Sequence, residues 1–226
     1  MGLGNIPWIV PSCYNWREIA QKKGVSKEYP AGCTILNQGD VVQNLYYVDK
    51  GLARFVIVDA GGKARAPGIL FPGSVFGDGP LFLGEPLTIN VQAIETSLIY
   101  NISKETAYRA INDNPQLAVD IICNVTLKFK SAIKSLGSQS IFNPKERLVY
   151  FWYSLLKYNQ SELMEEYNKI PVNLSHQQLG EFIGTNRVTV CRIINSLKKI
   201  GCVRVVNNEI YVSSELLKEY VDLFEY

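Results

Sequence analysis

Two short helical patterns joined by a glycine-containing turn constrain this chain of 226 residues more than any other feature. Apolar residues recur at helical spacing on both sides of the tripeptide Gly184-Thr185-Asn186, which predicts one helix over residues 176–183 and another over residues 187–199. Ser175 is suited to cap the first helix, and Gly201 follows the end of the second. Two helices joined in this way form a helix-turn-helix.

The residues that flank this helix pair predict a wing. VRVV and EIYV, on either side of Asn207-Asn208, are typical of a β-hairpin closed by a tight turn. The segment KIPVNL (169–174) predicts a short strand, and an aromatic-rich helix is expected over residues 144–158. The amphipathic tail (213–224) predicts a last helix. Residues 141–226 therefore predict a winged helix-turn-helix.

In a helix-turn-helix the second helix enters the major groove of DNA by its N-terminal end. Its apolar side packs inward, which leaves two arginines on the outer face, and the arginine fork matches O6 and N7 of guanine. Hydroxyls and helix N-termini are suited to phosphate oxygens. The alternative is a pair of solvated arginines with no partner. The predicted DNA-binding residues are Arg187, Val188, Thr189, Cys191, Arg192, Ser175 and His176.

A second regular pattern occupies residues 113–140. Six apolar residues follow one another at spacings of 4, 3, 4, 3 and 4, the repeat of helices that pair side by side. We expect a dimerisation helix that starts near Asn114-Pro115 and is ended by Gly137 and Ser138, which would form a hinge. Packing of this row against a β domain of the same chain is the alternative. The predicted dimer interface consists of Ala118, Ile122, Val125, Phe129, Ala132 and Leu136.

Residues 29–102 have the pattern of β structure. Short apolar and β-branched runs alternate with Gly, Pro and Asp, which favours a small antiparallel barrel or roll, with a plain β-sandwich as the alternative. The predicted fold class is therefore α+β. We expect a β-roll effector-sensing domain over residues 1–112, a dimerisation helix and hinge over residues 113–140, and the winged helix-turn-helix over residues 141–226.

Composition narrows the functional classes. A net charge of +2 neither requires nor excludes a nucleic-acid partner. No apolar run is long enough to span a bilayer and no secretory signal is visible, so we expect a cytoplasmic protein without membrane contact. Five cysteines without CxxC spacing and a single histidine disfavour a disulfide framework and a metal site. We therefore expect no metal, no cofactor and no catalytic residues, with an enzyme built on the β-roll as the rival.

The segment LSHQQLGEFIGTNRVTVCRIINSLKKIGCV resembles the DNA-binding segment of the CRP/FNR family of bacterial transcription regulators. YPAGCTILNQGDVVQNLYYVDKGLARF (29–55) resembles the first strands of that family's sensor domain, and the apolar row falls where the family has its dimer helix. The resemblance covers nearly the whole chain. It implies a cupin-like β-roll that responds to a small molecule, a homodimer on near-palindromic promoter DNA, and RNA polymerase as a partner. A protein with these domains that binds other proteins instead of DNA is the rival.

By this resemblance the base-reading positions are Arg187, Val188 and Arg192. The cyclic-AMP and oxygen-sensing members typically have Glu at the middle position, where it accepts a hydrogen bond from cytosine N4. Valine accepts no hydrogen bond, but it packs on the thymine methyl group. We therefore expect a half-site with T where those relatives read C on the partner strand.

The family holds cyclic nucleotides with a Gly-Glu pair, an Arg-Ser pair and a Thr-Ser pair from the dimer helix. The matching positions here are Gly77-Asp78, Leu87-Thr88 and Ala132-Ile133. Without the arginine the phosphate loses a bidentate, charge-assisted contact, so cyclic AMP is disfavoured. The sensor half has no histidine for haem and no close N-terminal cysteine cluster for iron–sulfur. A cyclic-nucleotide-type sensor module remains an alternative.

NVTLKFK, NRVTV and YVDLFEY are similar to the halophenol-sensing (CprK-type) branch, whose dimer-helix lysine meets the phenolate at the position of Lys128. Such a lysine can pair with a halogenated or other aromatic acid, although an exposed helix lysine is the alternative. Asp78 departs from that branch, which has a second basic residue there, and an acid would repel a phenolate. The predicted effector-binding residues are Gly77, Asp78, Leu87, Thr88 and Lys128, with Tyr46, Tyr47, Phe71, Phe76 and Phe82 as candidates for an apolar lining.

Thiol chemistry is a further hypothesis for control. A disulfide between Cys13, expected in a flexible N-terminus, and Cys202, just past the recognition helix, would hold the DNA-binding domain in a wrong pose. Five buried and inert thiols are the alternative.

Overall fold

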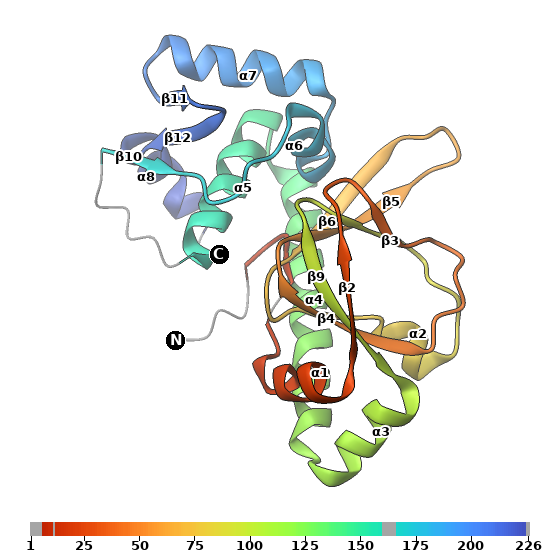
Figure 1. Ribbon diagram of the computed structural model, residues 1–226. Helices are drawn as coiled ribbons and strands as arrows, with labels where there is room; N and C mark the ends of the chain where they lie inside the picture. Colours follow the sequence, from red (N-terminus) through yellow and green to blue (C-terminus); the bar gives the residue numbers. More distant parts are fainter. Residues whose placement is uncertain (1–5, 11, 160–165, 225–226) are drawn as a thin grey trace. The chain divides into compact units, whose positions relative to one another are not determined.

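The computed structural model describes residues 6–10, 12–159 and 166–224. Within them the chain divides into two compact units, one built from residues 9–132 and the other from residues 6–8 and 133 onward. Figure 1 shows most of the strands in the first unit, and helices with one small sheet in the second. The predicted α+β class is confirmed. The predicted domain boundaries remain predictions, because the division between the two compact units falls inside a helix, between residues 132 and 133. Glu225 and Tyr226, the end of the aromatic tail, lie outside the described residues.

Two sheets form the β-roll of the first unit. All neighbouring strands are antiparallel except β1 and β6, which run parallel. The five-stranded sheet has the order β1 (Ile9–Val10), β6 (Ala64–Leu70), β5 (Ala53–Val58), β8 (Asn90–Ala93) and β3 (Thr34–Leu36). The four-stranded sheet has the order β2 (Val25–Tyr29), β9 (Ser97–Ser103), β4 (Asn44–Lys50) and β7 (Val75–Phe76).

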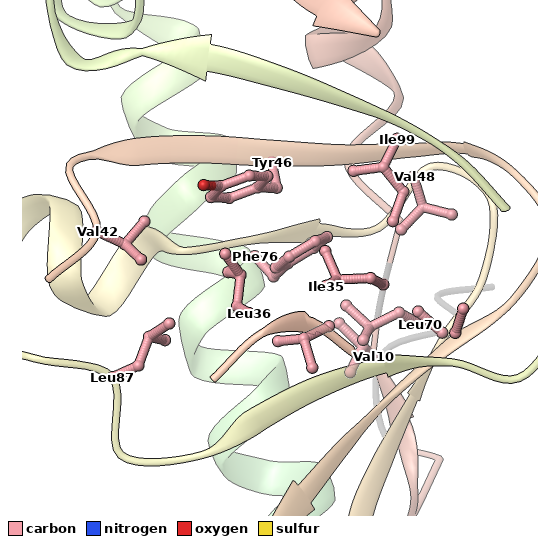
Figure 2. Packing of buried hydrophobic residues seen from close by; sticks show 13 residues of the cluster. Val10, Ile35, Leu36, Val42, Tyr46, Val48, Leu70, Phe76, Leu87 and Ile99 are labelled. Atoms are coloured by element: carbon pink, nitrogen blue, oxygen red, sulfur yellow. The ribbon is translucent and has the colours of Figure 1, made fainter. Parts of the chain in front are cut away.

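Strand β4 explains why this region is so apolar. Tyr46 and Val48 point between the two sheets, where the rings of Tyr46 and Phe76 stack at 5.0 Å (Figure 2). Leu45 and Tyr47 point to the opposite side, into a second cluster that contains helical residues. Because successive side chains of a strand alternate between faces, both faces of β4 are buried and its sequence is a nearly continuous apolar run.

Helices cover the outer face of the four-stranded sheet. They are the 3-10 helix η1 (Tyr14–Trp16), α1 (Arg17–Lys23) and α3 (Lys104–Asp113), while the short α2 (Asp78–Leu83) follows β7. None of these four was predicted from the sequence. Helix α3 begins where the Ser103 side chain accepts a hydrogen bond from the backbone N–H of Thr106, and it buries Ala107 and Ala110. The segment is amphipathic and begins with a serine cap, so the sequence contained the signal for this helix, and the prediction did not use it.

The predicted dimerisation helix is longer than expected. Helix α4 spans Gln116–Ile141 and continues through Gly137 and Ser138, so the prediction that these residues end it is wrong. A single glycine inside a helix costs only about 1 kcal/mol relative to alanine, which a long helix tolerates. The break comes at Asn143, whose backbone is extended ahead of Pro144. The division between the two units falls inside α4, between residues 132 and 133.

Most elements of the second unit lie where the sequence predicts them. They are α5 (Pro144–Tyr158), α6 (His176–Ile183), α7 (Arg187–Lys199), β11 (Val203–Val206), β12 (Glu209–Ser213) and α8 (Ser214–Phe224). Asn207 and Asn208 have φ of 50° and 62°, as a tight hairpin turn requires. The strand predicted over residues 169–174 is wrong in position. Strand β10 is Tyr167–Lys169 and pairs with β12; Pro171, which lacks an N–H, lies beyond its end.

The first described residues belong to the core of the second unit. Trp8 is fully buried, and its indole N–H donates to the carbonyl of Phe182 at 3.0 Å. Its ring contacts Tyr150 and Phe151 edge-on at 5.5 and 5.4 Å. The chain then passes into the first unit at β1. Residues far apart in the sequence therefore share one core.

Candidate DNA-binding surface and effector cavity

The turn between α6 and α7 is closed by glycine. Gly184 ends α6 with φ of 73°, a conformation that disfavours other residues. A side chain at Gly180 would meet the carbonyl oxygen of Thr185 at 2.9 Å, so the turn lies directly against α6 at that point. The backbone N–H of Thr185 donates to the carbonyl of Gly180 at 2.8 Å. These contacts fix how α7 leaves α6.

Both helices of this pair carry side-chain caps. The Ser175 hydroxyl oxygen accepts from the backbone N–H of Gln178, whose side chain accepts in return from the backbone N–H of Ser175. Asn186 caps α7 by accepting from the backbone N–H of Thr189 at 2.8 Å. The sequence reasoning treated Asn186 only as part of a break. Its type, directly before a helical pattern, was the signal for a cap.

Helix α7 separates its apolar and polar residues cleanly. Val190, Ile194 and Leu197 are buried against the rest of the unit. Arg187, Val188 and Arg192 are exposed, with Val188 at 58%, and we name these three residues the reading face. Neither arginine forms an ion pair within the part of the chain that the structure describes. Thr189 and Cys191, also predicted to bind DNA, are partly buried beside this face.

The remaining predicted DNA-binding residues lie next to the start of α7. Ser175, His176, Gln177 and Arg187 line one shallow depression at the N-terminal ends of α6 and α7. Gln177 is exposed and was not predicted; its amide N–H donates to the carboxylate of Glu181. Ser175 uses its oxygen for capping, which leaves its hydroxyl proton to donate outward. Hydroxyls, amides and a guanidinium gathered at two helix N-termini are suited to phosphate oxygens.

The apolar row of α4 lies in solvent on this single chain. Ile122, Phe129 and Leu136 are exposed by 64%, 66% and 70%, and Val125 is exposed as well. Ala132 is exposed and Ala118 is partly buried. Burial of such a row on a partner is favourable, because each exposed apolar side chain contributes about 25 cal/mol for every Å² removed from water.

All five predicted effector residues line one cavity in the first unit. Its volume is about 260 Å³, and it lies among β5, α2, α4 and the segment that ends in β8. Gly77, with φ of 82°, faces the Asn44 carbonyl, and a side chain there would meet that oxygen at 2.6 Å. Apart from the predicted five, the wall is mostly apolar: Phe55, Pro80, Leu83, Pro86, Ile89 and Val91. We name this space the effector cavity.

One ion pair crosses the effector cavity. The ammonium of Lys128, on α4, contacts carboxylate Oδ1 of Asp78, on α2, at 2.7 Å. The two side chains are only 17% and 14% exposed. The sequence left open whether Lys128 contacts a ligand or is an exposed helix lysine. In the structure its side chain is largely buried and its charge is neutralised by Asp78. The sequence reasoning placed both residues in the site but missed their pairing.

The cavity wall differs from the predicted aromatic lining. Leu87 is buried and belongs both to the wall and to the core between the sheets (Figure 2). Tyr46, Tyr47, Phe71 and Phe76 are buried in the core, and none of them lines the cavity. Phe82 is 42% exposed on α2, where it contacts Tyr108. In the part of the chain that the structure describes, the only aromatic residue of the wall is Phe55, in β5.

The cysteines differ from both expectations about them. Cys13 is buried, not flexible, and its thiol lies 3.7 Å from the carbonyl oxygen of Asp120. Burial raises the pKa of the Cys13 thiol to about 11, which leaves little reactive thiolate at neutral pH. The alternative of five buried thiols is also wrong, since Cys33 and Cys123 are exposed and Cys191 and Cys202 are partly so.

Two further features limit the chemistry of this chain. No cluster of three His, Cys, Asp or Glu side chains suited to a metal ion occurs in residues 6–10, 12–159 and 166–224. Across the same residues no helix combines the length and apolar character that crossing a membrane requires.

Comparison with known proteins covers both units. Residues 26–114 match the family model of the cyclic nucleotide-binding domain, and residues 146–217 match that of the Crp-like helix-turn-helix domain. The cyclic AMP receptor protein of Thermus thermophilus is 26% identical over 193 residues, which are 85% of this chain and 86% of that protein. The cAMP-activated global transcriptional regulator CRP of Escherichia coli is 24% identical over 172 residues, 76% and 81% of the two chains.

Solved structures agree with this architecture. CprK in complex with OCPA superposes with a TM-score of 0.74 at 20% identity, covering 97% of this chain and 99% of CprK. The c-di-GMP responsive regulator CLP of Xanthomonas campestris gives a TM-score of 0.76 at 16% identity, covering 89% and 99%. CprK is thus one similar fold among several. From its two matched domains, in their order and with the helix between them, the chain belongs to the CRP/FNR family of DNA-binding transcription regulators.

Proposed function

We propose that this protein binds a near-palindromic promoter site as a homodimer and responds to a small effector other than a cyclic nucleotide. The reading face carries the proposal. Arg187, Val188 and Arg192 lie exposed at the N-terminal part of α7, the end that enters the major groove in this motif. Phosphate contacts would come from the depression that Ser175, His176 and Gln177 form beside it. RNA polymerase is the further partner that we propose for a promoter-bound regulator.

The exposed row of α4 supports the homodimer. Six apolar positions at a/d spacing on one long helix favour a parallel partner helix, and a palindromic site requires a two-fold symmetric protein. Phe129→Asp would place a charge in the middle of this interface. We expect the dimer dissociation constant to rise at least 100-fold in sedimentation experiments, whereas Lys130→Asp, at the next, exposed position, should leave a dimer. A dimeric Phe129→Asp protein would contradict this assignment.

The effector cavity supports an effector that is not a cyclic nucleotide. Among the described residues Lys128 is the only cation on its wall, and Asp78 already binds it. The relatives from Thermus and Escherichia are named for cyclic AMP, but a cyclic phosphate in this cavity would meet Leu87 and the carboxylate of Asp78. An anion without a cationic partner is poorly stabilised where water is excluded.

Effector binding would act through α4. The cavity takes Lys128 from this helix, so a ligand there changes what α4 contacts, and a ligand that prefers one conformation shifts the population toward it. In the DNA-competent dimer the two α7 helices must lie about 34 Å apart to enter successive major grooves. Gly137 lies inside a continuous helix, so we propose Phe142-Asn143, between α4 and α5, as the pivot.

Thiol control is the second candidate, and the described residues favour it less. A disulfide between Cys13 and Cys202 would need the Cys13 thiol to leave its buried position and ionise well below its raised pKa. A Cys13→Ser protein should therefore keep whatever oxidant sensitivity its DNA binding shows.

The test of the proposed function is selection of duplexes from a random pool by reduced protein without added ligand. We expect an inverted repeat whose half-sites lie one helical turn apart. Recovery of no specific sequence from a stable dimer, with and without candidate effectors, would reject the proposal.

A further inference from the structure

The effector cavity has an unusual charge for a site in which a lysine lies on the wall. Its ionisable residues are Lys128, Asp78 and Glu85, so one positive and two negative groups leave a formal charge of −1. Glu85 is exposed at the rim and forms no ion pair within the described residues. The cavity therefore offers more negative than positive charge to a ligand.

The geometry of the ion pair decides which charge is available. Lys128 contacts Oδ1 of Asp78, and in the described part of the chain no hydrogen-bond donor is assigned to the other oxygen, Oδ2. A carboxylate has lone pairs for further donors on both oxygens. The Lys128 ammonium also has N–H donors to spare, but an anion bound to it would lie beside the largely buried carboxylate of Asp78, on a wall that carries Glu85 as well, so the net charge opposes an anionic ligand.

The rest of the wall defines the body of the ligand. Phe55, Leu83, Leu87, Ile89 and Val91 surround the pair with apolar surface, and the volume of about 260 Å³ fits a small molecule. We propose that the effector is a small organic cation, a protonated amine on an apolar or aromatic body, whose ammonium donates to Asp78 Oδ2 and faces Glu85. This inference rests on the proposed function, because it takes the cavity as the effector site, and it replaces the aromatic acid expected from sequence.

Three compounds that share a phenyl group test this directly: 2-phenylethylamine, 2-phenylethanol and phenylacetate, each titrated calorimetrically into the full-length protein at neutral pH. We expect the amine to bind at least tenfold tighter than phenylacetate, with the alcohol between them. Phenylacetate binding as tightly as the amine, or an amine that fails to bind at 10 mM, would overturn the inference.

Variants of the two acidic residues on the cavity wall test the same preference for an amine. Asp78→Asn removes the acid and releases Lys128, so the preference should invert, with amine affinity falling at least tenfold and phenylacetate affinity rising. Glu18→Gln, which removes an exposed acid of a surface ion pair in the same unit, should change neither affinity. If Asp78→Asn does not fold, Glu85→Gln at the exposed rim should still weaken the binding of the amine two- to threefold. An unchanged amine affinity in that variant would count against the inference.

The cationic effector and the regulatory role of the cavity can be refuted separately. A preference for phenylacetate refutes the cationic effector while sequence-specific DNA binding remains. Tight amine binding that leaves the affinity for the selected duplex unchanged keeps the ligand class and refutes the role of the cavity in regulation.

Discussion

The reading face and the effector cavity use their basic residues in opposite ways. Arg187 and Arg192 extend into solvent without an ion pair among the described residues, whereas Lys128 is partly buried and paired with Asp78. An arginine that binds DNA can stay hydrated and unpaired in the free protein, because its favourable free energy of binding comes from the release of counterions condensed on the DNA. A cation that faces a small cavity must be neutralised, because an isolated buried charge is strongly unfavourable. A lysine on a cavity wall that is already paired with a carboxylate is therefore not by itself evidence for an anion site.

The largest effect should come from removing both arginine side chains of the reading face. We expect the Arg187→Ala/Arg192→Ala double variant to lose at least 100-fold in affinity for the selected duplex, since each bidentate arginine–guanine contact is worth about 1–3 kcal/mol. Fluorescence anisotropy of a labelled duplex measures this. Arg109→Ala, which removes an exposed arginine from α3 in the other unit, is the matched control and should bind as the parent does. A loss below threefold in the double variant would show that these arginines are merely solvated.

An intermediate effect is expected from the ion pair of the cavity. Lys128→Met and Asp78→Asn should each lower the free energy of unfolding by about 1.5–3 kcal/mol, because each leaves a largely buried partner unpaired. The double variant should lose clearly less than the sum of the two. Urea unfolding of all four proteins gives the coupling energy, and additive losses would mean that the two side chains do not interact energetically.

The smallest effect concerns one base pair. Val188→Glu should change the preferred base at the position that Val188 faces from T to C, by about tenfold in relative affinity, because a carboxylate accepts from cytosine N4 and a valine does not. Competition between two duplexes that differ only there measures the change. Thr189, partly buried at the next position, supplies the control as Thr189→Val, which should leave the base preference as it is. Unchanged preference in Val188→Glu would remove this residue from the reading face.

The sequence predicted the second unit better than the first, and the reason is the range of the interactions. Helices α6 and α7 are set by caps, a turn glycine and apolar spacing that all lie within about 30 residues, so local patterns suffice. Helix α2 has only six residues, too few to leave a periodic pattern. Helix α3 is amphipathic and capped by Ser103, so its signal was present in the sequence but was not used.

The same reason explains the candidate sites. Residues of the reading face are neighbours along one helix, and the sequence named all three. Lys128 and Asp78 are 50 residues apart, and only the packed β-roll brings them to 2.7 Å. Resemblance to a family located both residues at the site, but a family pattern aligns positions one at a time. It does not show that two substituted positions have become partners.

Trp8 has a consequence for the order in which the chain becomes folded. Its hydrogen bond to Phe182 joins residues 174 positions apart, so a residue synthesised long before the helix-turn-helix completes the core of that unit. At about 5–20 residues per second, translation takes roughly 10–35 s to reach Phe182 after Trp8. The indole has no partner during that interval. Synthesis from the N-terminal side therefore leaves the DNA-binding unit dependent on a residue that is made well before its own helices, and its core closes only after Phe182 has been added.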